Sequence, residues 1–174
     1  MVDRSNFAQL SDSVITIYED RLVAKDIILD VHQFLQEKKI ATLTNDADFM
    51  SQRNEAINHE LEILVDRYGT TALTENETQV FKDLQQNIKG LLAAEQKAKA
   101  NDYASSDGVL NAINRIEFNL NDLSTIQITE GRRQVAIAKR AKASIDLFTQ
   151  LEIYVLIFLA VVIQVIILYK PKEE

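Results

Sequence analysis

The sequence predicts an all-α protein, an up-down-up-down antiparallel four-helix bundle with helix four continuing into a C-terminal transmembrane helix. The first observation is that the 174 residues include only four Gly and one Pro, the residues that disfavour helix interiors by roughly 1 and 3 kcal/mol. The second is that apolar residues recur at three- and four-residue steps, the spacing of one helix face. The third is an apolar run near the C-terminus, from Ile153 to Tyr169.

The first helix is expected from about Arg4 to Lys38. A loop should follow over 41–46, where the sequence ATLTND carries turn-forming residues. The inward stripe of this helix is predicted to contain Phe7, Leu10, Val14, Ile17, Ile27, Ile28, Val31, Phe34 and Leu35.

The second helix is expected from about Ala47 to Tyr68 and should end at Gly69, because glycine commonly terminates helices in the left-handed conformation. Its inward residues are predicted to be Ile57, Leu61, Leu64 and Val65.

The third helix should begin at a capping box, since Thr74 and Glu77 have the spacing of an N-cap and an N3 residue. It is expected to run to about Ala100, where the segment 101–108 (NDYASSDG) forms the next turn. The predicted inward residues are Val80, Phe81, Leu84, Ile88, Leu91 and Leu92.

The fourth helix should start near Ser106 and meets no firm stop before Pro171. Gly131 is an isolated weak point that a helix tolerates. The predicted inward stripe comprises Leu110, Ile113, Ile116, Leu120, Leu123, Val135, Ala138, Ile145 and Phe148.

The chain therefore divides into a bundle domain (1–150), a transmembrane helix (151–169) and a short polar tail (170–174). Between Ile153 and Tyr169 only Gln164 is strongly polar, and these 17 residues rise about 25 Å. Extended by Leu151, the run just spans a hydrocarbon core of about 30 Å. The alternative, a buried core helix, would need a larger protein around it.

The orientation in the membrane is open, because lysines and arginines flank the run on both sides, at 139–142 and at 170–172. No signal peptide or other apolar span precedes residue 150, which predicts a tail-anchored protein with a cytosolic bundle. However, helices one and four are predicted to be longer than the other two and to reach the bilayer together. We therefore also expect an upstream membrane helix to precede Met1 in the complete protein.

Three places resemble the four-helix-bundle ligand-binding domain of methyl-accepting chemotaxis receptors and related bacterial sensors, over about residues 7–150. Residues 13–22 (SVITIYEDRL) look like the family's acidic-Arg-Leu stretch after an aromatic residue. Residues 68–82 (YGTTALTENETQVFK) are similar to its tyrosine, short loop and T/S-x-x-E helix start. The fourth helix, finally, runs directly into a membrane helix, as in those receptors.

The resemblance implies a periplasmic bundle on a bacterial inner membrane, with ligands in the membrane-distal half, often at a dimer interface. The sequence departs from the family by lacking the first membrane helix. It also lacks a linker, a methylated hairpin and a signalling tip after Tyr169, so a partner would have to carry any signal onward.

The composition excludes several kinds of chemistry. The net charge of −7 disfavours nucleic acid as a partner. With no cysteine, a disulfide framework, a thiolate metal site and a Cys nucleophile are excluded. The sequence has no nucleophile elbow, phosphate loop, zinc motif or cofactor fingerprint, so we expect neither an enzyme nor a cofactor.

His32 and His59 are the only histidines, and folding of helices one and two would offset them by about 7 Å. Asp30 or Glu60 could add ligands to a metal site, but the Glu-x-x-His motif of di-metal bundles is missing. Two surface histidines are the favoured interpretation.

Tyr18 and Arg21 lie in the receptor-like stretch of helix one. Arg21 could bind a ligand carboxylate through its planar fork, whereas the favoured alternative is an ion pair with Asp20 or an acid on helix four. Lower on these helices, interhelical ion pairs of about 0–1 kcal/mol each are expected between the acids Asp12, Glu19 and Asp20 and the basic residues Arg132, Arg133, Lys139 and Arg140. The alternative is that these basic side chains bind anionic headgroups or an acidic partner.

The leading hypothesis is a membrane-anchored, chemoreceptor-like sensor or ligand-binding module without its own signalling domain. It would be a homodimer or act through a membrane protein partner, with a small molecule as ligand. The alternative is a non-catalytic accessory or structural subunit of a larger membrane complex. The sequence alone designates no catalytic, cofactor, metal or ligand-binding residue.

Overall fold

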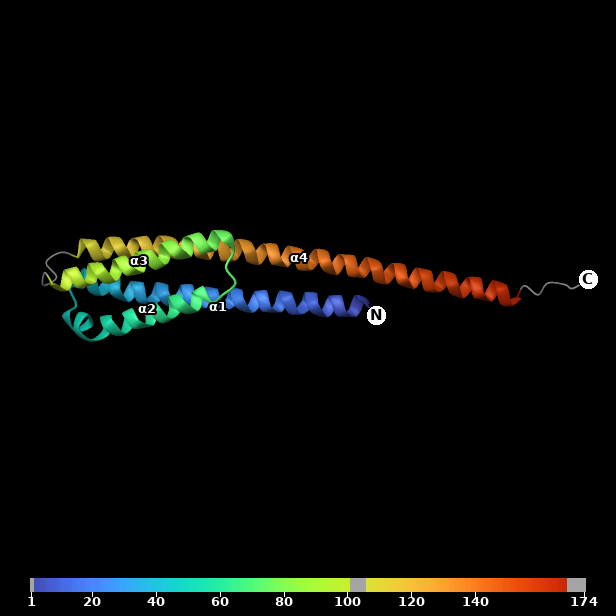
Figure 1. Ribbon diagram of the computed structural model, residues 1–174, viewed down its shortest axis with the longest axis horizontal. Coiled ribbons are helices and arrows are strands. Elements are labelled where there is room, and N and C mark those ends of the chain that lie inside the picture. Colours follow the sequence, from blue (N-terminus) through green and yellow to red (C-terminus); the bar gives the residue numbers. More distant parts are fainter. Residues whose placement is uncertain (1, 101–105, 169–174) are drawn as a thin grey trace, which may run out of the picture. The chain divides into compact units, whose positions relative to one another are not determined.

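The computed structural model describes residues 2–100 and 106–168, with side chains from Asp20 onward apart from those of residues 141 and 145. Within these residues it is all-helical and contains no strand, as predicted (Figure 1). Contacts divide the chain into two compact units, one ending at Gly131 and the other beginning at Arg132. The elements in chain order are α1 (Val2–Thr44), the π-helix η1 (Phe49–Arg53), α2 (Asn54–Gly69), α3 (Glu75–Ala100) and α4 (Asp107–Leu168).

Helix α1 ends at Thr44, six residues beyond the predicted end at Lys38, so most of the predicted loop over 41–46 is helical. The helix stops because Asn45 adopts a left-handed conformation with φ of 51°. Beyond it, the Asp46 amide donates to the Ala41 carbonyl at 3.0 Å, which is the long hydrogen bond of a Schellman cap. Asparagine enters the left-handed region more easily than other side chains, and this terminates α1.

The second predicted helix begins at Ala47 as expected, but its first part is wound as the π-helix η1. The Asp46 carboxylate caps this turn by accepting the Phe49 amide at 3.0 Å. Wide π turns are rare and frequently occur at functional sites. The end of the bundle at which α1 connects to α2 is therefore a candidate location for a functional site.

Gly69 ends α2, as predicted, but not for the predicted reason. No glycine among the described residues has a positive φ, and the cap is Thr70, whose amide donates to the Arg67 carbonyl at 3.1 Å. A Cβ at Gly69 would lie 3.2 Å from Cζ of Phe81, closer than ordinary van der Waals contact. A larger residue at position 69 would therefore require the Phe81 ring to move by a few tenths of an ångström.

The capping box at the start of α3 is confirmed. The Thr74 amide donates to Oε2 of Glu77 at 2.7 Å, and the Glu77 amide donates to Oγ1 of Thr74 at 3.3 Å. These two bonds satisfy helix-terminal donors that have no partner within the helix.

Helix α4 is continuous from Asp107 through Gly131 to Leu168, which confirms that the predicted fourth helix runs unbroken into the apolar segment. Its first turn is closed by the Leu110 amide, which donates to the Ser106 carbonyl at 3.0 Å. Part of the turn predicted over 101–108 lies outside the described residues. The described lengths also follow the prediction: α1 and α4 have 43 and 62 residues, whereas α2 and α3 have 16 and 26.

The core of the first unit draws apolar side chains from α1, α2, α3 and the first part of α4, which lie side by side (Figure 1). Burying such side chains is the main favourable contribution to folding. Most of the predicted inward residues from Ile27 onward are buried or half-buried, whereas those at 7–17 fall outside the described side chains. The most deeply buried apolar residues are Val31, Leu35, Ile57, Leu61, Leu91, Ile113, Ile116 and Leu123.

The prediction is wrong further along α4, where Val135 and Phe148 are exposed rather than inward. The described part of the unit that starts at Arg132 consists of α4 alone, so it contains no second helix against which this stripe packs.

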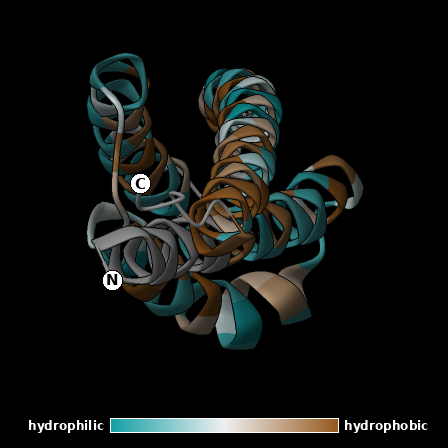
Figure 2. Ribbon diagram, turned by 90° about the vertical axis from the view of Figure 1, so that its right-hand side faces the viewer, coloured by the Kyte–Doolittle hydropathy of each residue, from teal (hydrophilic) through white to brown (hydrophobic). Residues whose placement is uncertain are grey.

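The apolar run of α4 is exposed at every described position from Leu151 to Leu168, which argues against a buried core helix. Hydrophobic colouring covers this part of the ribbon (Figure 2). Among the described residues, α4 is the one helix long and apolar enough to cross a membrane, judged by length and composition.

The left-handed cap of α1 can be tested at Asn45. The Asn45→Ala variant should lose about 1 kcal/mol of unfolding free energy, because a Cβ without a local hydrogen-bonding group is strained at positive φ. The Asn45→Gly variant should stay within a few tenths of a kcal/mol of the original protein. Denaturation of the full chain in detergent, followed by circular dichroism, measures both. Equal stability of the two variants would contradict the cap.

Candidate functional site

The first polar cluster, called here the Glu77 cluster, contains one side chain from each of the four helices: Arg21, Tyr68, Glu77 and Gln127. Glu77 is completely buried, and its Oε1 accepts from Nη1 of Arg21 at 2.6 Å and from Nε2 of Gln127 at 2.5 Å. Nη1 of Arg21 also donates to Oε1 of Gln127 at 2.9 Å, and Nε2 of Gln127 donates to Oη of Tyr68 at 3.1 Å.

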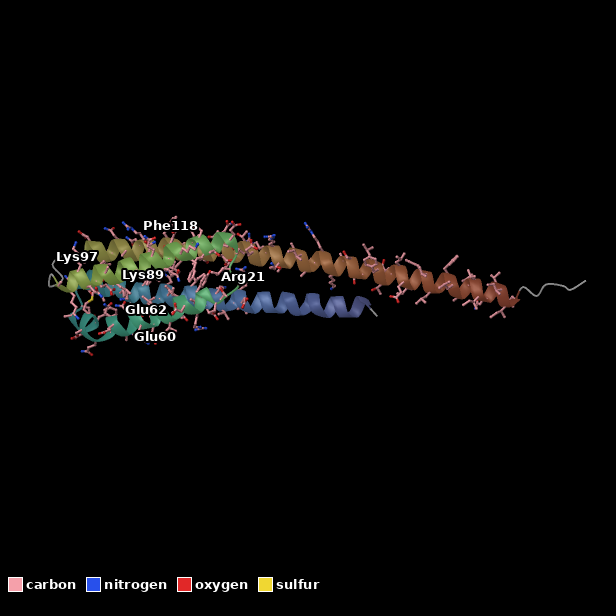
Figure 3. The ribbon with its side chains drawn as sticks, in the orientation of Figure 1. Arg21, Glu60, Glu62, Lys89, Lys97 and Phe118 are labelled. Carbon is pink, nitrogen blue, oxygen red and sulfur yellow. The ribbon has the colours of Figure 1, made fainter. Side chains whose placement is uncertain are left out.

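The Glu77 cluster corrects the prediction for Arg21, which is labelled in Figure 3. Arg21 pairs with Glu77 on α3, not with Asp20 or with an acid on α4. Its side chain is only 15% exposed and its guanidinium is paired with the buried Glu77, so it is not presented to a ligand carboxylate. The partner was missed because the sequence does not reveal that the N3 residue of α3 lies level with Arg21. The side chain of Tyr18 lies outside the described ones.

Burial is the main reason that the pKa of Tyr68 rises to about 12. The hydrogen bond from Gln127 acts in the opposite direction and lowers it, whereas the negative charge of Glu77 raises it further. The ring of Tyr68 also packs on that of Phe81, with a centroid separation of 5.3 Å. Tyr68 therefore remains a neutral phenol in the folded protein until strongly alkaline pH.

A second polar cluster, the Lys38 cluster, joins α1, α2 and α3. The side chain of Lys38 is 1% exposed, and its Nζ lies 2.6 Å from Oε1 of Glu95. Nζ also donates to Oδ1 of Asn54, and Oε2 of Glu95 accepts from Nδ2 of Asn54 at 3.1 Å and of Asn58 at 2.9 Å. Burial lowers the pKa of Lys38, while the charge and hydrogen bond of Glu95 raise it. The bundle thus holds a neutralised ion pair in its interior.

A cavity of about 700 Å³ lies beside the Lys38 cluster, between the end of α1, η1, the end of α3 and the start of α4. Glu95 and Asn54 belong to both the cluster and the cavity wall. We call it the Lys38 cavity. Its lining residues are Thr42, Asn45, Ala47, Met50, Ser51, Asn54, Glu95, Ala98, Lys99, Ser106 and Val109.

Two buried polar atoms at this end of the bundle have no hydrogen-bond partner, Oγ1 of Thr42 and Oδ1 of Asn58. Thr42 lines the Lys38 cavity, and Asn58 belongs to the Lys38 cluster. Leaving a buried polar group unpaired costs about 1–3 kcal/mol. Such groups are therefore candidates for partners supplied from outside the protein.

Little in the sequence indicated the Lys38 cavity. Lys38 was expected to end helix one, and a lysine at a helix end normally interacts with solvent or with the helix dipole. The signal that could have found it is the pair of asparagines four residues apart, Asn54 and Asn58, which flank the predicted inward residue Ile57 on helix two. Polar residues at inward positions need partners inside the bundle.

The other sequence candidates do not converge on a site. His32 and His59 are both exposed, and no group of three or more potential metal-ligating side chains occurs in the described part of the chain. The side chains of Asp12 and Glu19 are not among the described ones. Their expected pairing with the basic residues of helix four therefore stays a prediction.

Comparisons with known proteins add no relative. No protein-family model, no curated protein and no solved structure matches the chain. Over residues 2–100 and 106–168 the chain is all-helical, with one helix long and apolar enough to cross a membrane. Its function must be argued from the two clusters and the cavity.

The raised pKa of Tyr68 predicts a pH dependence of stability. An unfolded tyrosine releases its proton near pH 10, whereas folded Tyr68 keeps it to about pH 12. The unfolded chain thus binds fewer protons than the folded one in this window, so the contribution of Tyr68 to stability is complete below pH 10. It is lost as pH rises, by at most ~1.4 kcal/mol per pH unit.

The Tyr68→Phe variant isolates this contribution, since every other titrating group is retained. The difference in unfolding free energy between the original protein and this variant should shrink from pH 9 to pH 11 in detergent. A difference that stays constant over this range would show that Tyr68 is not held as a buried neutral phenol.

Proposed function

We propose that the chain is a membrane-anchored sensor module that binds a small molecule in the Lys38 cavity. In this proposal residues 1–150 form an up-down-up-down antiparallel four-helix bundle, and helix four continues across the membrane. The observation that carries the proposal is that α4 lines the Lys38 cavity with Val109 and, as one continuous helix, also contains the apolar run up to Leu168.

The size and lining of the cavity support a small-molecule ligand. Its volume of about 700 Å³ falls within the range of about 300–1,000 Å³ typical of ligand pockets. Met50, Ala98 and Val109 supply apolar wall, while Ser51 and Ser106 supply hydroxyls. Ligand pockets generally combine apolar walls with a few positioned polar groups of this kind.

The electrostatics support a polar ligand. Glu95 is neutralised by Lys38 at 2.6 Å, so Lys99, the cation that lines the cavity, leaves a net positive lining. The Oγ1 atom of Thr42 has no hydrogen-bond partner. A ligand that supplies partners to such groups is stabilised by bonds that the empty protein does not make.

The continuity of α4 supports transmission of a signal. A ligand that contacts Val109 acts on the first turn of a helix whose other end carries the apolar run. Packed helices shift by about 1–2 Å as rigid elements in switching proteins. A membrane partner or a second copy would then read the displacement of α4.

In this proposal the stretches that resemble chemotaxis receptors correspond to a specific set of contacts. The two receptor-like stretches, 13–22 and 68–82, contribute Arg21, Tyr68 and Glu77 to one hydrogen-bonded cluster. By the resemblance, the bundle would lie in the periplasm and the anchor in the inner membrane of a bacterium. The alternative placement is a tail-anchored protein with a cytosolic bundle.

A second candidate function is that of an accessory subunit in a larger membrane complex. It is favoured by the exposed apolar side chains on α1, since Leu29, Ile40 and Leu43 are 64%, 61% and 63% exposed. Exposed apolar surface of this kind often marks a contact with another protein.

A thermal-shift screen tests the leading proposal. The full chain in detergent is heated with a library of small carboxylates, amino acids, amines and sugars. A binder should raise the unfolding temperature, and at a concentration 100 times its dissociation constant the stabilisation is about 2.7 kcal/mol. The Ser51→Phe variant, which fills the mouth of the cavity, should abolish that shift.

The matched control is Gln52→Phe, next to Ser51 in η1 but not part of the cavity lining; it should respond like the original protein. A hit that survives Ser51→Phe would place the ligand elsewhere. A folded chain that responds to no compound, yet co-purifies with a membrane complex, would favour the accessory-subunit function.

A further inference from the structure

A second cavity lies on the outside of the bundle, between α3 and α4. It has a volume of about 360 Å³ and is lined by six residues, Asn87 on α3 and Asn111, Asn114, Arg115, Phe118 and Asn119 on α4. We call it the Phe118 site. It shares no lining residue with the Lys38 cavity, and neither polar cluster includes any of its residues.

Asparagine is unusually frequent on this part of α4. Four of the eleven residues from 111 to 121 are asparagine, although asparagine is among the less favourable residues for a helix interior. Three of the four line the Phe118 site, at positions 111, 114 and 119. The lining residues at 111, 114, 115 and 118 have the three- and four-residue spacing of one helix face. Helix stability therefore does not account for the amides of this face.

The amides of the Phe118 site are held in position by hydrogen bonds between helices. Asn119 is 7% exposed, and its Oδ1 accepts from Nδ2 of Asn87 at 2.7 Å. This bond leaves Oδ1 of Asn87 as an acceptor and Nδ2 of Asn119 as a donor. Oδ1 of Asn114 accepts from Nζ of Lys39 on α1 at 3.1 Å, which leaves its Nδ2 as a second donor. The site thus presents donors and an acceptor in defined positions.

Phe118 adds an exposed aromatic ring to these amides. It is 65% exposed and is labelled on the outer side of α4 in Figure 3. A ligand that covers the ring removes apolar surface from water, which is favourable. The ligand that fits this site therefore has an apolar face for the ring of Phe118 and hydrogen-bonding groups around its edge.

A sugar ring has this combination of properties. Its C–H groups carry partial positive charge because each ring carbon is bonded to oxygen, and the face of an aromatic ring is negative. The hydroxyls around its edge each donate and accept hydrogen bonds, as an asparagine amide does through its two groups. The fork of N–H donors on Arg115, which also lines the site, matches two adjacent hydroxyl oxygens.

Other classes of ligand fit the Phe118 site less well. Its described lining residues include no acid, so a cation has no carboxylate to bind. A simple anion would use Arg115 but would leave the ring of Phe118 uncovered. A protein partner needs a larger surface, since a stable interface has about 20–30 residues on each side.

We propose that the Phe118 site binds a saccharide, with one sugar ring stacked on Phe118 and its hydroxyls bonded by Asn87, Asn114 and Asn119. The cavity volume of about 360 Å³ is near the lower end of the range for ligand pockets, so a short stretch of saccharide fills it. A longer glycan could continue into solvent, because the α4 residue Asn111 at its edge is exposed. The proposal does not depend on the Lys38 cavity.

Saturation-transfer NMR of the full chain tests the proposal, in a detergent without a sugar headgroup. The probes are D-glucose, D-galactose, D-mannose, N-acetyl-D-glucosamine and oligosaccharides of each. At least one should bind, and Phe118→Ala should weaken its binding at least about fivefold, because the stacking surface is lost. Phe118→Trp should keep the affinity. The matched control is Ile128→Ala, an exposed apolar residue of α4 outside the site, which should bind like the original protein.

The amides are tested by Asn114→Asp, which keeps an acceptor for Lys39 but removes the Nδ2 donor. It should weaken saccharide binding about fivefold, the effect of one lost hydrogen bond. Asn121→Asp introduces the same charge at an exposed asparagine of α4 that does not line the site, and it should leave the affinity unchanged. Equal weakening by both variants would contradict the role of the Asn114 donor.

The source of the saccharide follows from the same titrations. Binding of monosaccharides identifies a free sugar as the ligand, whereas binding confined to oligosaccharides identifies a glycan chain, and either result supports the site. A folded chain that binds none of the probes, or binds them equally well after Phe118→Ala, would overturn the proposal.

The Ser51→Phe variant separates this proposal from the proposed function. A saccharide whose binding is lost in Ser51→Phe but kept in Phe118→Ala occupies the Lys38 cavity, which would overturn the Phe118 site and support the sensor. Saccharide binding that survives Ser51→Phe and is lost in Phe118→Ala supports the Phe118 site, whether or not the Lys38 cavity binds a ligand.

Discussion

The bundle depends on one constraint: the Glu77 carboxylate is fully buried and must be neutralised from inside the protein. Removing one partner from a buried ion pair costs about 3–5 kcal/mol, because the remaining charge has lost its hydration. Arg21, Gln127 and the Thr74 amide supply the compensation, from α1, α4 and the N-cap position of α3. Apolar side chains tolerate small slips along a helix, whereas this cluster fixes the level at which the four helices meet.

The Glu77 cluster also explains why the other end of the bundle can hold a cavity. There the chain carries a π turn, a left-handed Asn45 and two polar atoms without partners. Such features store unfavourable free energy of roughly 1–3 kcal/mol each, which the core and the Glu77 cluster must offset.

Local patterns predicted much of the fold. Scarce Gly and Pro, the helical periodicity, the Thr74–Glu77 capping box and the apolar run led to four helices with nearly the observed limits. The predictions from sequence failed where the outcome depends on which residues lie close together in three dimensions. Asn45 ends α1 through its own conformation, Gly69 lies against the Phe81 ring, and Arg21 pairs with a residue on α3. The Lys38 cluster could not be predicted from the sequence for the same reason. Its members can be paired only when the positions of α1, α2 and α3 along one another are known.

The measurement that tests this account most directly is a double-mutant cycle on Arg21 and Glu77 in the full chain. Glu77→Gln keeps an acceptor for the capping box while removing the charge, and Arg21→Met removes the opposite charge. If the pair anchors the bundle, each single variant loses about 3 kcal/mol of unfolding free energy. The double variant should then lose at least about 1.5 kcal/mol less than the sum. Losses that add to within about 0.5 kcal/mol would contradict the central role of the buried carboxylate.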